Sequence, residues 1–227
     1  MTRPASTGEI AAIVFDFDGL ILDTETPIFA SWSLVFDEHA STPLTMEEWS
    51  SEIGTVGGLD LVELFQSRAV TDIDIEELQA RRRAHRDQLL AREVVRPGVE
   101  QWIADAQARN LPLAIASSSE VEWVDPHLRR LGLRDAFAYL ACHGPDLAAK
   151  PDPATYLDAC AGLGVDPASA LAIEDSPHGV TAARAAGLRV VAVPNSVTAR
   201  LDLSHADLVV ESLARFSLDD ALAMVAG

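Results

Sequence analysis

Lysine, cysteine and long apolar runs are scarce in this chain of 227 residues, and each scarcity argues against a class of partner or of structure. Sixteen of the seventeen basic residues are arginine, so Lys150 is the only lysine, against thirty-five acidic residues and a formal net charge of −18. Nucleic acids and anionic membrane surfaces are bound through basic patches. We therefore expect neither as a partner.

The two cysteines, Cys142 and Cys160, lie in apolar sequence and lack the spacing of a metal site or a redox pair. We predict that both are reduced core residues and that the protein is cytoplasmic. Only one six-residue apolar run precedes Asp16. It is too short for a signal-peptide core or a membrane span.

The length of the chain allows one full α/β core with an inserted subdomain. Short apolar runs predict strands at 10–15, 113–116, 137–141, 171–173, 190–193 and 208–210. Helical patterns lie between them, at 99–109, 121–131, 153–163 and 180–186. Because strands and helices alternate, we predict an α/β fold with a doubly wound, Rossmann-like parallel sheet.

Residues 24–94 break this alternation, because they contain helical patterns and no convincing strand. The patterns cover 29–38, 46–53, 59–68 and 75–92. We predict a catalytic core of residues 1–23 and 95–227 and a helical cap subdomain of residues 24–94. The cap follows the first strand directly, so it should lie over the carboxyl ends of the strands, where open α/β sheets bind ligands.

Two carboxylates, Asp16 and Asp18, follow the first predicted strand and precede a turn at Gly19. Like charges at close range repel and raise the pKa of one of the two groups. An acidic pair beside the core therefore indicates a functional role for the pair, and we expect it to bind a divalent cation. Asp16 could attack an electrophile or bind metal, and Asp18 could transfer a proton. Taken alone, the pattern also fits acids that form turns or cap helices.

A second acidic pair, Glu174 and Asp175, follows another predicted strand. Because parallel strands all end at one edge, the two pairs should meet and form a cluster of four carboxylates that must be neutralised. Oxygen ligands without a nearby His or Cys favour a hard cation, and Mg²⁺ is the best candidate. Asp175 or Ser176 could instead cap the helix that begins at Pro177, and capping is compatible with metal binding through a different residue.

Two further polar segments complete the candidate site. Ser117, Ser118 and Ser119 follow a predicted strand, and hydroxyl and N–H groups at such a junction could hold phosphate oxygens. An ordinary helix-capping loop is the alternative. The lone lysine, Lys150, could pair with Asp16 and with a phosphoryl oxygen.

The chain resembles the haloacid dehalogenase-like hydrolase superfamily in four segments that occur in the family's order: Asp16-x-Asp18-Gly19, Ser117, Lys150-Pro151 and Glu174-Asp175-Ser176. The fuller segments around them look like the branch with a helical cap, which contains β-phosphoglucomutase and small-molecule phosphatases. The resemblance covers nearly the whole chain. Each motif is weak singly, but four in order are highly specific.

The resemblance implies roles for these residues. Asp16 would be the nucleophile that forms an aspartyl-phosphate, and Asp18 the general acid and then base. The implied phosphate ligands are Ser117, Ser118 and Lys150. The implied ligands of Mg²⁺ are Asp16, the backbone carbonyl of Asp18, Asp175, and Glu174 directly or through water.

We therefore expect a Mg²⁺-dependent, monomeric phosphatase of small phosphomonoesters such as sugar or metabolite phosphates. A β-phosphoglucomutase-like mutase is one alternative. Such mutases bind a second phosphate through a cap-loop arginine and a lysine shortly after the serine motif. Here the loop at 54–58 reads Gly-Thr-Val-Gly-Gly and Glu120 follows the serines, which favours the phosphatase. A non-catalytic phospholigand-binding module is the alternative of another class.

Within the predicted cap, Ile75, Leu78 and Leu89 form an apolar stripe at helical spacing, and Arg82 and His85 interrupt that stripe. Either residue could face substrate. The alternative is that both lie at the edge of the apolar stripe and extend their polar ends to solvent. We expect substrate specificity to come from cap residues such as those at 55–58.

Overall fold

Six parallel strands form one sheet in this computed structural model, which describes residues 9–50 and 60–225. The order along the sheet is β3-β2-β1-β4-β5-β6. The strands are β1 (Ala12–Phe15), β2 (Leu113–Ser117), β3 (Tyr139–Cys142), β4 (Ala170–Glu174), β5 (Arg189–Ala192) and β6 (Leu208–Val209). This arrangement confirms the predicted α/β class.

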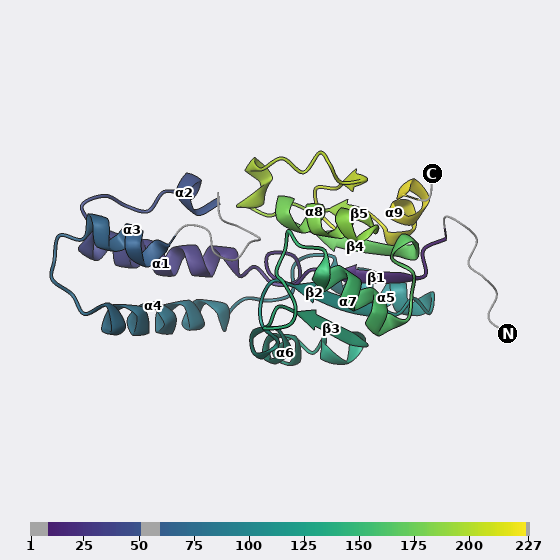
Figure 1. The fold of residues 1–227 in the computed structure, drawn as a ribbon, viewed down its shortest axis with the longest axis horizontal. Coiled ribbons are helices and arrows are strands. Elements are labelled where there is room, and N and C mark those ends of the chain that lie inside the picture. The colour runs from purple at the N-terminus through teal and green to yellow at the C-terminus, as the bar shows by residue number, and fades with distance from the viewer. Residues whose placement is uncertain (1–8, 51–59, 226–227) are drawn as a thin grey trace.

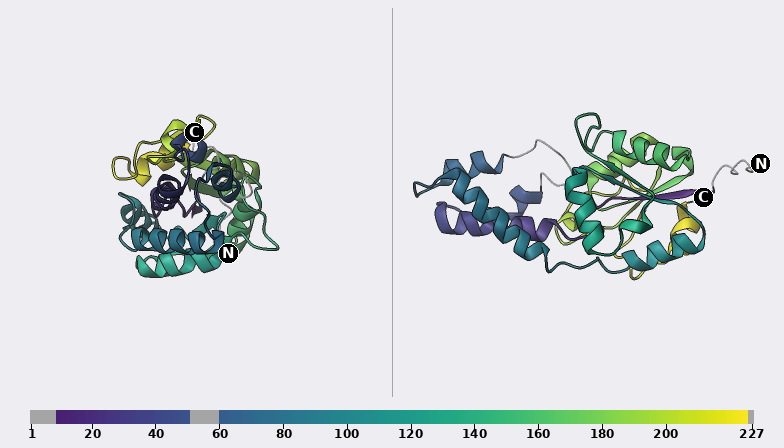
Figure 2. Two further views of the ribbon diagram at one scale, coloured as in Figure 1. Left: turned by 90° about the vertical axis from the view of Figure 1, so that its left-hand side faces the viewer. Right: turned by 90° about the horizontal axis from the view of Figure 1, so that it is seen from below.

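Helices cover both faces of the sheet (Figure 2). One face carries α5 (Val99–Ala108), α6 (Val121–Arg130) and α9 (Leu218–Val225), and the other carries α7 (Ala154–Leu163) and α8 (Pro177–Ala186). Successive side chains of a strand point to opposite faces, so Ile13 and Phe15 join the first layer of the core and Val14 joins the second. All four residues of β1 are fully buried, as the continuous apolar run predicts.

Among the described residues, four helices lie between β1 and α5 along the chain: α1 (Glu25–His39), α2 (Met46–Ser50), α3 (Leu61–Arg68) and α4 (Ile75–Leu90). They lie beyond the carboxyl end of β1, on the side of the molecule away from the amino ends of the strands (Figure 1). They bury a small core of their own, which includes Trp32, Phe36, Phe65 and Leu78. The inserted helical cap is thereby confirmed as part of the fold. The predicted loop at 54–58 lies outside the described residues.

Several element boundaries differ from those predicted, for local reasons. β3 begins at Tyr139 because a 3-10 turn, Arg134–Ala136, precedes it and Phe137 closes that turn, with its ring 6.0 Å from the ring of Phe15. α8 begins three residues before the apolar pattern at 180–186, and the Ser176 hydroxyl accepts the N–H of Gly179, which confirms the predicted capping by Ser176. Capping side chains are short-range features that apolar periodicity does not report.

Both cysteines are free. Cys160 is buried as predicted, whereas Cys142 is only half-buried at the end of the edge strand β3. Burial raises the pKa of Cys142 to about 12 and that of Cys160 to about 11. In the part of the chain that the structure describes, every helix is too short or too polar to cross a membrane.

Candidate active site

The carboxyl ends of β1 and β4 bring two acidic residues to one buried ammonium. The Lys150 Nζ atom donates to Asp16 Oδ1 and to Glu174 Oε1, at 2.5 Å in each case. Asp16 follows β1 directly, and its N–H donates to the Ile173 carbonyl of β4. The three charged residues are at most 6% exposed. Ion pairs this deeply buried are strongly coupled, because little water screens them.

Three carboxylates share this end of the sheet. Asp16, Glu174 and Asp175 each offer an oxygen, and the three oxygens lie within 4.8 Å of one another. Burial raises the pKa of Asp16 to about 8 and that of Asp175 well above its usual range. Nearby carboxylates act in the same direction, and Lys150 opposes them at Asp16. Three carboxylates therefore face a single ammonium, that of Lys150, and a hard divalent cation held by oxygen atoms fits the cluster.

Glu174 is the most enclosed member of the cluster. Its Oε1 atom also accepts from the Tyr156 hydroxyl at 2.7 Å, and its Oε2 atom accepts from the N–H of Asp175 at 3.0 Å. A Cβ atom at Gly179 would lie 1.9 Å from the Glu174 carboxylate, so only glycine lets the start of α8 come this close. These contacts fix the carboxylate that holds Lys150.

The Asp18 side chain lies outside the three-carboxylate cluster, which corrects the prediction of four clustered carboxylates. Its Oδ2 atom accepts from the Ser119 hydroxyl at 2.7 Å, and its Oδ1 atom accepts from the Trp123 indole N–H at 2.8 Å. β1 ends before Asp16, and the chain turns at Gly19 with φ +77°. The turn and the two donors direct the Asp18 carboxylate away from Asp16.

The serines at the end of β2 contact the site and do not cap α6. The Ser117 hydroxyl lies 3.4 Å from Asp18 Oδ2, and the Ser118 hydroxyl accepts the backbone N–H of Lys150 at 3.2 Å. The N-cap of α6 is Glu120, which makes no capping hydrogen bond through its side chain. The helix-capping alternative for the serines is therefore not observed, and the loop joins β2 to the lysine.

Asn195 and Arg96 support the site but were not predicted from the sequence. The Asn195 Nδ2 atom donates to Asp175 Oδ2 at 2.6 Å and to the Gly19 carbonyl at 3.2 Å, and the Arg96 guanidinium donates to the same carbonyl. Asn195 comes shortly after the end of β5. Its position shortly after a predicted strand could have identified Asn195 from the sequence, because the other candidate residues also follow strands. Arg96 comes from the segment that returns from the cap and carries no such signal.

Glu25 is a further unpredicted member of this region. It is the first residue of α1 and is half-buried. Burial raises its pKa to about 8, and the carboxylates of Asp18, Asp23 and Asp16 act in the same direction. Glu25 therefore lies close to the predicted catalytic carboxylates, where the chain passes from the sheet into the cap.

Arg82 lies inside the cap and is only 9% exposed, so it does not extend to solvent at the edge of a stripe. Its guanidinium lies 4.6 Å from the centre of the Trp32 ring and donates to Gln79 and, at 3.4 Å, to Ser31. Burial lowers its pKa to about 10. His85 is half-buried one turn further along α4.

A doubly wound sheet with a helical insertion after its first strand, and with a buried lysine that contacts acidic residues at the strand ends, is typical of a class of capped hydrolases. Residues 13–193 match the family of haloacid dehalogenase-like hydrolases. The chain belongs to this family and is a phosphoric monoester hydrolase of the haloacid dehalogenase-like class.

Related proteins agree with this assignment. The Bacillus subtilis (strain 168) protein YhcW, named as a phosphatase, is 40% identical over 209 residues, which is 92% of this chain and 94% of the relative. Hexitol phosphatase B of Escherichia coli (strain K12) is 33% identical over 190 residues, covering 82% and 84%. The crystal structure of CbbY from Rhodobacter sphaeroides in complex with phosphate has a TM-score of 0.73 at 28% identity, covering 90% and 95%.

Proposed function

We propose that the protein is a Mg²⁺-dependent phosphatase of small phosphomonoesters, such as sugar or other metabolite phosphates. The observation that carries the proposal is the Lys150 ammonium held between Asp16 and Glu174, beside Asp175. The names of the hexitol phosphatase and of the phosphate-bound CbbY structure support a small phosphorylated ligand. We retain the expectation of a cytoplasmic monomer.

In the first step, an Asp16 carboxylate oxygen attacks the phosphorus atom and forms an aspartyl-phosphate. The bond from phosphorus to the leaving oxygen breaks, and protonated Asp18 gives its proton to that oxygen. Lys150, Ser117 and Ser118 donate to the phosphoryl oxygens. Uncatalysed hydrolysis of phosphate monoesters is so slow that these groups together must lower the barrier by on the order of 20 kcal/mol.

In the second step, water attacks the phosphorus atom and Asp18, now a carboxylate, accepts the proton of that water. The bond from phosphorus to the Asp16 oxygen breaks, which frees inorganic phosphate and restores the Asp16 carboxylate. The same aspartate, Asp18, therefore acts first as acid and then as base. Asp18 lies two residues after the proposed nucleophile, and its charge is one cause of the raised pKa of Asp16, which supports a position near the reaction.

The proposed metal ligands are Asp16, the backbone carbonyl of Asp18, Glu174 and Asp175. When bound, Mg²⁺ would supply positive charge that offsets negative charge on the phosphoryl group. Asn195 orients Asp175 through its hydrogen bond. Lys150 keeps its hydrogen bond to Asp16 Oδ1 in this scheme and adds its own positive charge to the site.

We propose that residues 24–94 act as one cap that closes over the strand ends and excludes water during the reaction. The predicted boundaries place Glu25 and α4 in this unit. Mutase activity is the less favoured reading, because Glu120 at the start of α6 puts a negative charge beside the serine loop. A second phosphate group would be repelled there.

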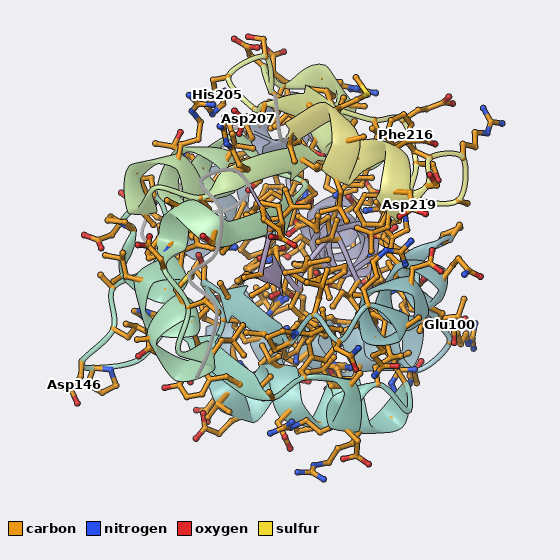
Figure 3. The ribbon with its side chains drawn as sticks, turned by 90° about the vertical axis from the view of Figure 1, so that its right-hand side faces the viewer. Glu100, Asp146, His205, Asp207, Phe216 and Asp219 are labelled. Carbon is orange, nitrogen blue, oxygen red and sulfur yellow. The ribbon has the colours of Figure 1, made fainter. Side chains whose placement is uncertain are left out.

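The mechanism is tested with Asp16→Asn and with chelation of divalent metal, using release of inorganic phosphate from 4-nitrophenyl phosphate and from a panel of phosphorylated metabolites. We expect the variant to be inactive and EDTA to abolish activity reversibly. Asp146→Asn is the control, because Asp146 lies on the surface (Figure 3). Turnover by Asp16→Asn, or by the unmodified protein in the presence of EDTA, would contradict the proposed mechanism.

A further inference from the structure

Both oxygens of the Asp18 carboxylate accept hydrogen bonds from neutral side chains of the core. The Trp123 indole N–H lies 2.8 Å from Oδ1, and the Ser119 hydroxyl lies 2.7 Å from Oδ2. Indole is a donor only, with one fixed N–H direction on a rigid ring. The two bonds together therefore define both the position and the plane of the carboxyl group.

The Trp123 ring is also contacted by a residue of the cap. The Arg86 guanidinium of α4 lies 5.0 Å from the centre of the Trp123 ring, at a distance typical of cation–π contacts. Arg86 is itself held by Asp87, whose Oδ1 atom is 2.7 Å from the guanidinium. A ring contact between Trp123 and His127 at 4.7 Å supports the indole from within α6. A chain of contacts thus leads from the cap helix to Asp18.

We propose that Trp123 is a positioning residue for Asp18 and that Arg86 makes this positioning depend on the placement of the cap. The inference rests on the proposed function, in which Asp18 protonates the leaving group. Neither residue contacts the phosphoryl group in this scheme. Their effect must therefore appear in proton delivery and not in phosphate binding.

The requirement for proton delivery depends on the leaving group. Phenolate is a strongly basic leaving group and needs protonation, whereas 4-nitrophenolate is stabilised by its nitro group and needs it far less. Phenyl phosphate and 4-nitrophenyl phosphate differ only by the nitro group, so comparing their ratio between a variant and the unmodified protein isolates this difference. The kcat/KM value reports steps up to the first irreversible one, which here is transfer of the phosphoryl group to Asp16.

The first test compares Trp123→Phe with the unmodified protein. Phenylalanine keeps an aromatic ring beneath Arg86 but removes the N–H donor. General acid catalysis typically contributes about 10²–10⁴-fold, so a displaced acid should lower kcat/KM for phenyl phosphate about tenfold more than for 4-nitrophenyl phosphate. Equal losses with the two esters, or no loss with either, would overturn the role assigned to Trp123.

The second test removes the cation. Arg86→Met keeps an unbranched apolar side chain and deletes the guanidinium, and Arg83→Met on the same helix is the matched control because Arg83 is exposed. We expect Arg86→Met to shift the ratio of the two kcat/KM values in the same direction as Trp123→Phe, and Arg83→Met to leave it unchanged. An unchanged ratio in Arg86→Met would overturn the link to the cap.

Failure of the proposed function is distinguishable from failure of this inference. If the unmodified protein releases no phosphate from either ester or from the panel of phosphorylated metabolites, the proposed function fails before any variant is compared. If Asp16→Asn retains activity, the aspartyl-phosphate mechanism fails. The inference itself concerns only the ratio of the kcat/KM values for the two esters. That ratio is compared once the unmodified protein is shown to be active and Asp16→Asn inactive.

Discussion

Lys150 and Asp16 are 134 positions apart in the chain, yet the Nζ atom of the lysine lies 2.5 Å from Oδ1 of the aspartate. The same ammonium reaches Glu174, so one positive charge joins the ends of two neighbouring strands. Lysine provides a compact point charge, whereas arginine presents a wide planar group. This geometric requirement gives a physical reason why the only lysine of an arginine-rich chain stands here.

The first prediction concerns Lys150→Met. Glu174 is fully buried and would lose its cation, and removing one partner of a buried ion pair typically costs about 3–5 kcal/mol. Loss of a preorganised donor to the phosphoryl group should also lower kcat/KM by about 10²–10³-fold. Urea unfolding and hydrolysis of 4-nitrophenyl phosphate measure the two effects.

Arg215→Met is the control for this variant. Arg215 pairs with Glu211 on the surface, where both side chains are more than 70% exposed, and such pairs contribute less than about 1 kcal/mol. A Lys150→Met protein as stable and as active as Arg215→Met would show that the buried ammonium has neither role.

Gly179→Ala tests the close approach of α8 to Glu174. The added Cβ would lie 1.9–2.0 Å from the carboxylate atoms, so the helix or the carboxylate must move. Overpacking of this kind typically costs about 1–3 kcal/mol, and displacement of Glu174 should also lower activity. Gly144→Ala is the matched control, because a Cβ there meets nothing within 4 Å. Equal midpoints of urea unfolding for the two variants would contradict the prediction.

Glu25→Gln tests the raised pKa of Glu25. Its folded-state pKa of about 8 exceeds the ordinary value of 4.5, so the folded protein binds this proton more tightly than the unfolded chain does. The resulting stability is complete below about pH 4.5 and is lost as the pH rises towards 8. Glutamine cannot ionise. We therefore expect Glu25→Gln to raise the thermal unfolding midpoint at pH 8 more than at pH 5.

Glu100→Gln is the control for the pH experiment. Glu100 also occupies the first turn of a helix, α5, but its side chain lies at the surface (Figure 3). For Glu100→Gln we expect the same change in midpoint at pH 5 and at pH 8. The same result for Glu25→Gln would mean that the pKa of Glu25 is not raised by its surroundings in solution.

Asn195→Ala tests support of the proposed metal ligand Asp175. The lost hydrogen bond is 2.6 Å long and holds Asp175 Oδ2 in place. Changes in residues that orient metal ligands typically weaken metal binding about 10–100-fold. We expect the Mg²⁺ concentration for half-maximal activity to rise within this range. Ser196→Ala is the control, because Ser196 is the next residue and is exposed. Identical Mg²⁺ titrations for the two variants would refute the prediction.

Much of the fold could be predicted because parallel strands buried on both faces are continuous apolar runs. The run that contains β1 is one example, and the helical stretch that follows it indicated an insertion. The ends of elements were predicted less well. Apolar periodicity alone placed the start of α8 at residue 180, and only the residue types of Ser176 and Pro177 indicated the earlier start and the cap that the structure shows.

The candidate site was predictable where its residues directly follow strands, because the ends of parallel strands share an edge. Asp16, Glu174 and Asp175 belong to this group, and the structure brings them together. Tyr156 and Trp123 were not predicted. Both lie within helices, where an aromatic residue normally indicates core packing, and their hydrogen bonds join segments distant in sequence.

The sequence by itself determined the order of strands and helices, the place of the insertion and the set of acids at the strand ends, because apolar periodicity and turn residues are local properties. Only the tertiary structure decided how the charges are paired. It directed Asp18 towards Trp123 and away from the cluster, and it placed Arg86 of the cap against that same indole. Such contacts depend on how distant segments pack, and no local pattern encodes that packing.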